Sequence, residues 1–167
     1  MPSIEEIRNL SEPLKGYQFK ITIANPPGVG ASVQELQFRC TSAAIPGKTI
    51  EESLVNLHGY NVKHAGRSIP VGVWTATFIE GTLAQIIQRI RSWQEICHNQ
   101  SSGVQGRSSE YKRNIIMELL NNDQSVSQTH RIVGAWPQDV PDVLMDSASS
   151  EPTRYDVTFA YDYHEIV

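Results

Sequence analysis

The feature that most constrains this 167-residue chain is a long alternation near its C-terminus. Tyr155, Val157, Phe159, Tyr161 and Tyr163 lie at every second position, and mostly polar residues lie between them. Successive side chains of a β-strand point to opposite faces of a sheet, so this pattern predicts a strand with one buried face over residues 155–164. Such a strand must bury its apolar face against a second layer of structure.

Shorter runs of the same alternation predict further strands over residues 17–23, 33–40, 71–79, 112–120 and 129–136. The Pro- and Gly-rich run 25–30 separates the first two strands, because proline has no N–H to donate and glycine readily adopts positive φ. We therefore expect the first two strands to pair as a hairpin.

One segment has the period of a helix instead. Apolar residues recur three or four positions apart from Leu83 to Cys97, and Thr82 with Gln85 fits a capping box. The pattern predicts one amphipathic helix over residues 82–98, with Trp93 on its buried face. One helix among six or seven strands, without strand–helix alternation, predicts a mainly β fold: an antiparallel β-sandwich or barrel with one flanking helix.

A chain of this length is expected to form a single domain, here over residues 17–167 after an N-terminal segment, residues 1–16. Residues 41–68 are the unusual part of that domain, because glycine and proline interrupt a polar stretch of weak periodicity. Loops longer than about 15 residues are uncommon in compact domains and are usually functional or disordered. We expect an ordered excursion with a short hairpin inside it, since residues 54–62 keep strand-like side chains.

Composition limits the classes of partner. Charged residues make up 19% of the chain, below the roughly 25% typical of soluble domains, which favours a surface that is covered in an assembly. The formal net charge of −4 provides no basic excess to hold nucleic acid or acidic lipid. Two cysteines are too few for a disulfide framework, and neither a signal peptide nor a membrane-spanning apolar run is present. We expect a soluble protein made inside the cell.

No combination of residues indicates catalytic, cofactor or metal chemistry. Gly28-Val29-Gly30 lacks the Lys-Ser/Thr and the following helix of a phosphate loop, so we expect a plain turn. The five histidines lack the spacing of metal ligands. Cys97 and His98 are neighbours on a helix and point about 100° apart, which makes them a poor pair of nucleophile and base. We expect no enzymatic activity.

A series of longer motifs indicates a relationship. In chain order they are LQFRCTSAAIPG, YNVKHAGRSIPVGVWTATF, IQRIRSWQEI, SSEYKRNIIMELLN, IVGAWPQDVPDVLMD and YDVTFAYDYHEI. Their order and spacing over residues 17–166 resemble the tail tube protein of T-even-type contractile-tail bacteriophages. The SSEYKR stretch and the GAWP turn are the most specific pieces, and residues 1–16 depart most from the family pattern.

This resemblance implies a subunit of a hexameric ring, in which strands of neighbouring subunits complete one β-barrel and stacked rings form a hollow tube that conducts DNA. It implies a place in the virion tail after assembly in the host cytoplasm, with no membrane involved, and contacts with sheath, baseplate and tail-terminator proteins. The family's long loop reaches a neighbouring subunit or ring. The interface residues expected on this ground are Ile45, Pro46, Leu54, Val55, Leu57 and Tyr60.

The lumen of such a tube is expected to be neutral or acidic, since a basic channel would hold DNA at every phosphate. If polar strand faces line it, the candidates are Gln18, Lys20, Thr22, Gln37 and Arg39, or alternatively Asp156, Thr158 and Asp162. Three other functions stay open on sequence alone. One is a tube subunit of a contractile injection or type VI secretion machine, which would carry proteins. A second is a related baseplate or tail-terminator subunit, and the third is a non-catalytic β-sandwich carbohydrate- or protein-binding module.

Overall fold

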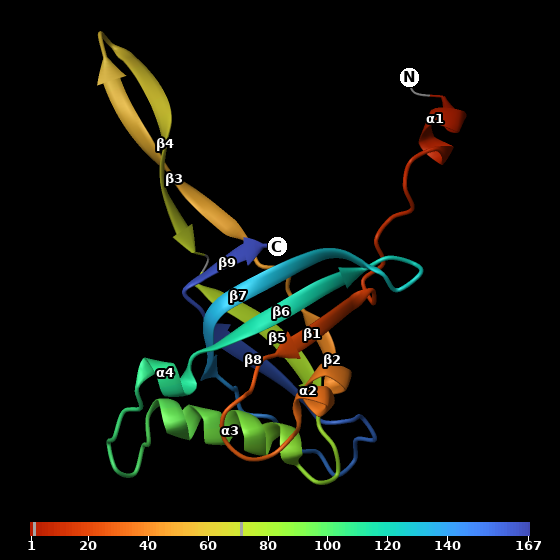
Figure 1. Cartoon of the computed structure of the whole chain (residues 1–167), viewed down its shortest axis with the longest axis vertical. Coiled ribbons are helices and arrows are strands. Elements are labelled where there is room, and N and C mark those ends of the chain that lie inside the picture. Colours follow the sequence, from red (N-terminus) through yellow and green to blue (C-terminus); the bar gives the residue numbers. More distant parts are fainter. Residues whose placement is uncertain (2, 71) are drawn as a thin grey trace.

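The computed structural model describes residues 1, 3–70 and 72–167 (Figure 1). The strands in these residues are β1 (Phe19–Ile23), β2 (Cys40–Ala43), β3 (Lys48–Leu57), β4 (Tyr60–Pro70), β5 (Val73–Ile79), β6 (Arg113–Leu120), β7 (Val126–Asp139), β8 (Arg154–Ala160) and β9 (Tyr163–Ile166). The helices are α1 (Ile4–Arg8), α2 (Val33–Arg39), α3 (Gln85–Cys97) and α4 (Ser108–Tyr111). Seven strands form one antiparallel sheet in the order β1-β6-β7-β8-β5-β2, with β9 also on β7, and β3 pairs only with β4.

Strand β7 divides this sheet into two layers. Its first part, residues 126–135, pairs with β6 and in places with β9, whereas residues 136–139 pair with β8. Gly134 lies near this change of layer with φ of 69°, and a Cβ there would collide with the carboxylate of Asp162. We call β1, β6, the first part of β7 and β9 layer A, and the last part of β7, β8, β5 and β2 layer B.

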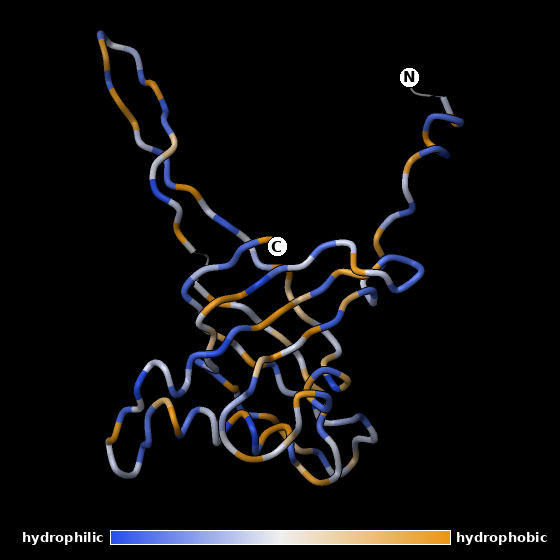
Figure 2. Tube along the Cα trace, viewed as in Figure 1, coloured by the Kyte–Doolittle hydropathy of each residue, from blue (hydrophilic) through white to orange (hydrophobic). Residues whose placement is uncertain are grey.

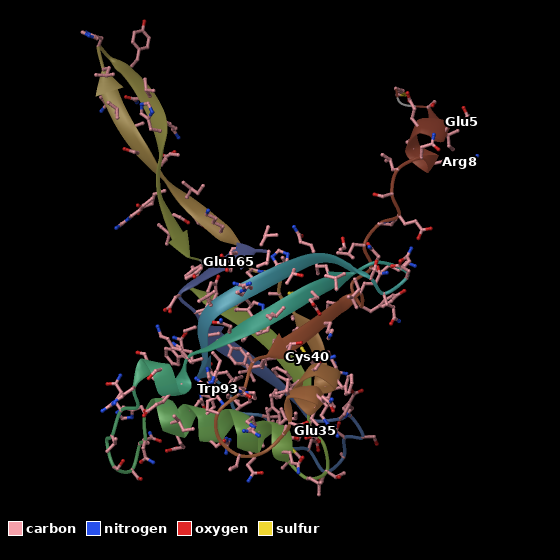
Figure 3. All side chains as sticks on the ribbon, viewed as in Figure 1. Glu5, Arg8, Glu35, Cys40, Trp93 and Glu165 are labelled. Carbon is pink, nitrogen blue, oxygen red and sulfur yellow. The ribbon has the colours of Figure 1, made fainter. Side chains whose placement is uncertain are left out.

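The core lies between the two layers and against α3. Trp74 of β5 and Trp93 of α3 are fully buried, and both rings pack on Phe159 of β8, with centroid separations of 5.4 and 5.9 Å. The indole N–H of Trp93 donates to the backbone carbonyl of Tyr111, 2.7 Å away, so its one polar group is satisfied. Figure 3 shows Trp93 pointing from α3 into the space beneath the sheet. The expected sandwich with a flanking helix is confirmed, and Trp93 lies on the buried face of that helix.

The strand predicted over residues 33–40 is wrong, because residues 33–39 form helix α2. Ser32 caps this helix: its hydroxyl accepts from the N–H of Glu35, and the Glu35 carboxylate accepts from the N–H of Ser32. This capping box outweighs the apparent alternation of Leu36 and Phe38, of which only Leu36 is buried. The predicted pairing of the first two strands is also wrong, since β1 pairs with β6 and β2 with β5.

Other boundaries differ for local reasons. Helix α3 begins at Gln85 without the Thr82–Gln85 box, because the Glu80 carboxylate accepts from the N–H groups of Ile86 and Ile87 instead. The predicted C-terminal strand is divided in two near Asp162, whose carboxylate makes an ion pair with Lys112 at 2.7 Å. The start of the strand predicted over 71–79 falls on Val71, which lies outside the described residues; β5 begins at Val73.

Trp93 provides a test of this packing. Trp93→Ala removes a fully buried ring that contacts the sheet, so we expect the free energy of unfolding to fall by about 3–5 kcal/mol in thermal or denaturant unfolding followed by circular dichroism. Leu83→Ala is the control, because Leu83 is exposed just before the same helix and its loss should cost less than about 0.5 kcal/mol. Equal stabilities of the two variants would contradict the orientation of α3.

Candidate assembly surfaces

The β3–β4 hairpin fills most of the excursion predicted over residues 41–68. Leu57 pairs with Tyr60 across a two-residue turn, in which His58 and Gly59 have φ of 47° and 82°. Positive φ at both turn positions is the type I′ geometry that matches the twist of a two-stranded ribbon. The pairing continues to the base of the hairpin with one bulge between Ile50 and Glu52. The hairpin is therefore much longer than the short one expected from sequence.

The two faces of the hairpin differ in polarity. Val55 pairs with Val62 and Leu57 with Tyr60, which places four apolar or aromatic side chains on one face. The pair Leu54–Lys63 lies on the other face, where Lys63 also makes an ion pair with Glu52 at 2.8 Å. Figure 2 shows hydrophobic and hydrophilic residues alternating along both strands. The hairpin is thus an amphipathic ribbon with an apolar face of residues 55, 57, 60 and 62.

No part of the described domain covers this apolar face. The hairpin projects away from the two layers (Figure 1). Residues 48–57 and 60–69 are exposed apart from half-buried Glu51, and Pro46, just before the hairpin, is half-buried. Tyr60 keeps 76% of its surface exposed. An isolated two-stranded hairpin is marginally stable in water, so a ribbon of this length is expected to need a second surface. Ile45, Leu54, Val55, Leu57 and Tyr60 are all exposed on it or beside it.

Unpaired strand edges form a second candidate surface. Within the described residues β1 pairs only with β6, β9 only with β7, and β2 only with β5. Each of these strands therefore leaves one row of N–H and C=O groups without a partner in the chain. Such edges are templates for pairing with another strand.

The residues that lead into β1 form a third candidate surface, because they connect an exposed N-terminal segment to the sheet. Gln18 is only 7% exposed; its amide N–H donates to Asn122, and its amide oxygen accepts from the N–H of Lys15. Asn122 in turn donates to the carboxylate of Glu12. This network fixes the base of the N-terminal segment to the β6–β7 turn. A side chain buried in this way is not free to line a channel.

The other lumen candidates are spread over two elements. Lys20 and Thr22 lie on the outward face of layer A, where Lys20 makes an ion pair with Glu118 at 3.5 Å. Arg131 and Glu165 form a second pair on this face, 3.0 Å apart. Gln37 and Arg39 belong to α2 and not to a strand, so the structure does not bring the five candidates together.

The outward face of layer B is polar along its middle, with Val73 and Ile79 at the two ends of β5 and Arg154 at the start of β8 on the same face. Strand pairing places six of its side chains in two rows: Ser42, Thr77 and Asp156 in one, and Thr75, Thr158 and Asp139 in the other. The Thr77 hydroxyl donates to the Asp156 carboxylate, 2.7 Å away. These two rows contain hydroxyls and carboxylates but no lysine or arginine. We call them the hydroxyl face; the third alternative candidate, Asp162, lies outside it at the β8–β9 turn.

The Gly28-Val29-Gly30 run is a turn held by α3. The guanidinium of Arg89 donates to four backbone carbonyls of this run and its flanks: Pro26, Gly28, Gly30 and Ala31. A phosphate loop needs free N–H groups, whereas here the carbonyls converge on a cation. Sequence reasoning missed Arg89, and no local motif marks it.

The cysteines and histidines form no reactive cluster in the part of the chain that the structure describes. Burial raises the pKa of Cys40 to about 12 and that of Cys97 to about 11, so both are protonated at neutral pH. Burial and then the neighbouring His164 lower the pKa of His130, whose ring lies 6.5 Å from that of His164. Among the described residues no group of three or more potential ligands could hold a metal ion, and none of the helices is long and apolar enough to cross a membrane.

Together these surfaces define a class of protein. A β-sandwich that leaves strand edges unpaired and sends an uncovered amphipathic hairpin away from its core is a subunit that completes its packing in an assembly.

Comparison with known proteins identifies that assembly. A family model described as phage tail tube protein matches residues 15–167. The chain is 27% identical over 135 residues to the tail tube protein gp19 of Enterobacteria phage T6, and equally to that of phage T4, with 79% of this chain and 82% of each relative covered.

Two solved structures share the fold. A chain of the PVC sheath-tube complex in the extended state has a TM-score of 0.65 at 14% identity, covering 100% of this chain and 99% of that one. A chain of the six-fold symmetrised baseplate of the anti-feeding prophage has a TM-score of 0.63 at 15% identity, covering 95% and 97%.

The chain belongs to the phage tail tube protein family. It is a structural subunit of a phage tail tube and a component of the virion tail. The resemblance inferred from the ordered motifs is confirmed.

The alkylation rate of Cys97 tests whether burial keeps its thiol protonated. At pH 8 a pKa near 11 leaves a far smaller thiolate fraction than that of a free cysteine, so we expect Cys97 to react with iodoacetamide roughly a hundredfold more slowly than a free thiol. Unfolding in guanidinium should restore the normal rate. Fast alkylation of the folded protein, measured by mass spectrometry, would contradict the protonated state derived from burial.

Proposed function

We propose that six copies of this chain form a ring, that rings stack into a hollow tube, and that the tube conducts DNA when the phage ejects its genome. The observation that carries this proposal is the uncovered β3–β4 hairpin together with the free edges of β1, β2 and β9. Closing a ring pairs free strand edges and enlarges the barrel beyond what one chain could enclose. A head-to-tail contact between identical rings repeats without closing and therefore makes a filament.

The hairpin is the proposed connector between subunits or rings, with Ile45, Pro46, Leu54, Val55, Leu57 and Tyr60 in the contact. Its face of residues 55, 57, 60 and 62 is long enough to seat on a neighbour, and its aromatic side chain is of the kind that anchors interfaces. The domain over residues 17–167 would then act as a rigid body that carries this ribbon.

The hydroxyl face is the proposed lining of the lumen. Serine, threonine and aspartate side chains do not neutralise phosphates, so DNA that passes this face gains no free energy from counterion release. DNA would therefore slide along the lumen without being held. Asp156 and Thr158 belong to this face. Layer A is the weaker choice because its outward face carries two basic residues, Lys20 and Arg131, which Glu118 and Glu165 neutralise. On layer B, Arg154 lies at the start of β8, outside the two rows of the hydroxyl face.

The remaining partners follow from this role. Sheath, baseplate and tail-terminator proteins are the proposed contacts of the tube wall and its ends, with assembly in the host cytoplasm. The work of the subunit is mechanical and needs no catalytic group. Passage of DNA is favoured over passage of protein because the sequence relatives include tail tube proteins of phages T4 and T6, whereas the injection-system structures share the fold at only 14–15% identity.

Electron microscopy of the purified chain at rising concentration tests the proposal. Six-fold rings and stacked tubes are expected, with help from baseplate or sheath proteins if nucleation is slow. A strict monomer at high micromolar concentration in the presence of those partners would rule the proposal out.

The hairpin can be removed without touching the core. Replacing Gly47 to Arg67 by a short Gly-Ser linker should leave the melting temperature of the monomer within a few degrees of the parent, because these residues bury no part of the core, and should abolish tubes. Val55→Asp should weaken assembly without changing the stability of the monomer. Lys63→Gln, on the polar face of the hairpin, should leave assembly unchanged. Normal polymerisation of the shortened chain would show that the hairpin is not the connector.

A lysine placed on the face that lines the lumen should make the tube retain DNA. Tubes of Thr75→Lys assembled with short duplex DNA should retain nuclease-resistant DNA that salt releases, whereas parent tubes should retain little. Thr129→Lys on the outward face of layer A is the matched control, and its DNA should stay open to nuclease. Protection by Thr129→Lys tubes and not by Thr75→Lys tubes would assign the lumen to layer A.

A further inference from the structure

The first fourteen residues lie outside the region that the family model matches, and the structure shows them as an uncovered arm. Every described residue from Met1 to Tyr17 is exposed. The large apolar side chains among them include Ile4, Ile7, Leu10 and Leu14. Scattered exposed apolar residues are normal on a protein surface, but four of them on one projecting segment form a surface that favours a partner.

Helix α1 is preorganised but too short to be stable by itself. Ser3 and Glu6 form a complete capping box at its start. Isolated helices below about 12 residues are marginal in water, so five residues need tertiary cover. Ile4 and Ile7 are three positions apart and therefore lie on one face of the helix, where 66% and 53% of their surfaces are exposed.

The arm leaves its own domain uncovered, and hydrogen bonds hold its base at one edge of the sheet. The hydrogen bonds from Gln18 to Asn122 and from Asn122 to Glu12 fix it at the β6–β7 turn. Figure 3 shows Glu5 and Arg8 far from the two layers, on the side toward which the hairpin also projects. A neighbour is therefore the surface within reach of α1.

The opposite end of the molecule has a groove of mixed polarity. The segment between β7 and β8 forms a groove of about 470 Å³ whose lining includes Val143, Leu144, Met145, Asp146, Glu151 and Arg154. Leu144 and Met145 are 93% and 74% exposed. In Figure 1 this segment, drawn in blue, lies beside α2 at the end away from the arm and the hairpin.

We propose that residues 3–10 form a stacking arm whose Ile4–Ile7 face docks in the 143–154 groove of the next copy of this chain along the tube. The proposal rests on the tube proposed above, which brings the arm end of one subunit toward the groove end of the next. Charges at the two surfaces complement each other: Arg8 faces a groove with Asp146 and Glu151, and Glu5 can meet Arg154. The contact is heterologous, so it repeats along the tube.

Cysteine cross-linking of assembled tubes tests this contact. In a background in which Cys40 and Cys97 are replaced by alanine, the pair Ile7→Cys and Met145→Cys should form disulfides between copies under mild oxidation. Because every chain carries both partners, denaturing gels should show a ladder of trimers and higher oligomers. Each single-cysteine variant should give no band above a dimer.

Val104→Cys in place of Met145→Cys is the matched control, since Val104 is exposed in the loop after α3 and outside the groove. A ladder with Met145→Cys and none with Val104→Cys supports the arm contact. Tubes that form but give no Met145→Cys ladder, or a ladder only through Val104→Cys, overturn it while leaving the tube intact. Absence of tubes in the cysteine-free parent would instead count against the proposed function.

A second variant separates docking from folding. Ile4→Asp with Ile7→Asp should leave the melting temperature of the monomer unchanged, because α1 buries no residue, and should raise the concentration needed for tubes severalfold. An unchanged assembly threshold would contradict the arm contact.

Discussion

The backbone groups on the strand edges are the constraint on which the rest of this structure depends. A buried or partly buried sheet must pair its N–H and C=O groups, yet β1, β2 and β9 each pair on one side only within the described chain. Most small proteins cover or charge such edges. In the ring proposed above, another copy of the same chain would supply the missing strand, and the ring would then have no edge at all.

The rest of the molecule divides into a body that resists deformation and segments that reach outward. Trp74, Trp93 and Phe159 pack layer B against α3, and Arg89 ties the glycine-rich turn to the same helix. The hairpin contributes nothing to this core and is tied to the body only at its base. Such a division suits a wall that must keep its bore while its subunits are held by extended contacts with their neighbours.

Sequence patterns predicted correctly those strands and helices that bury one face and expose the other. The alternation in β8 and the helical spacing around Trp93 gave the correct element types, because one face of each is buried. The strand predicted over residues 33–40 was wrong because two local signals competed there. The alternation of Leu36 and Phe38 indicated a strand, but the Ser32–Glu35 capping box stabilises a helix. The length of the hairpin was underestimated because both of its faces meet solvent in the monomer, so its periodicity is weak. Gln18 looked like a lumen residue, since nothing local shows its bond to Asn122, more than a hundred residues away.

Hydrogen–deuterium exchange compared between monomer and tube measures the central claim most directly, because it reports backbone groups and not only particle shape. Amides of β3, β4 and the edge strand β2 should exchange fast in the monomer and become strongly protected in the tube, while those of β6, already paired on both sides by β1 and β7, should change little. Equal exchange of the hairpin and β2 amides in both states would contradict the account, since the edges and the ribbon would then remain uncovered in the assembly.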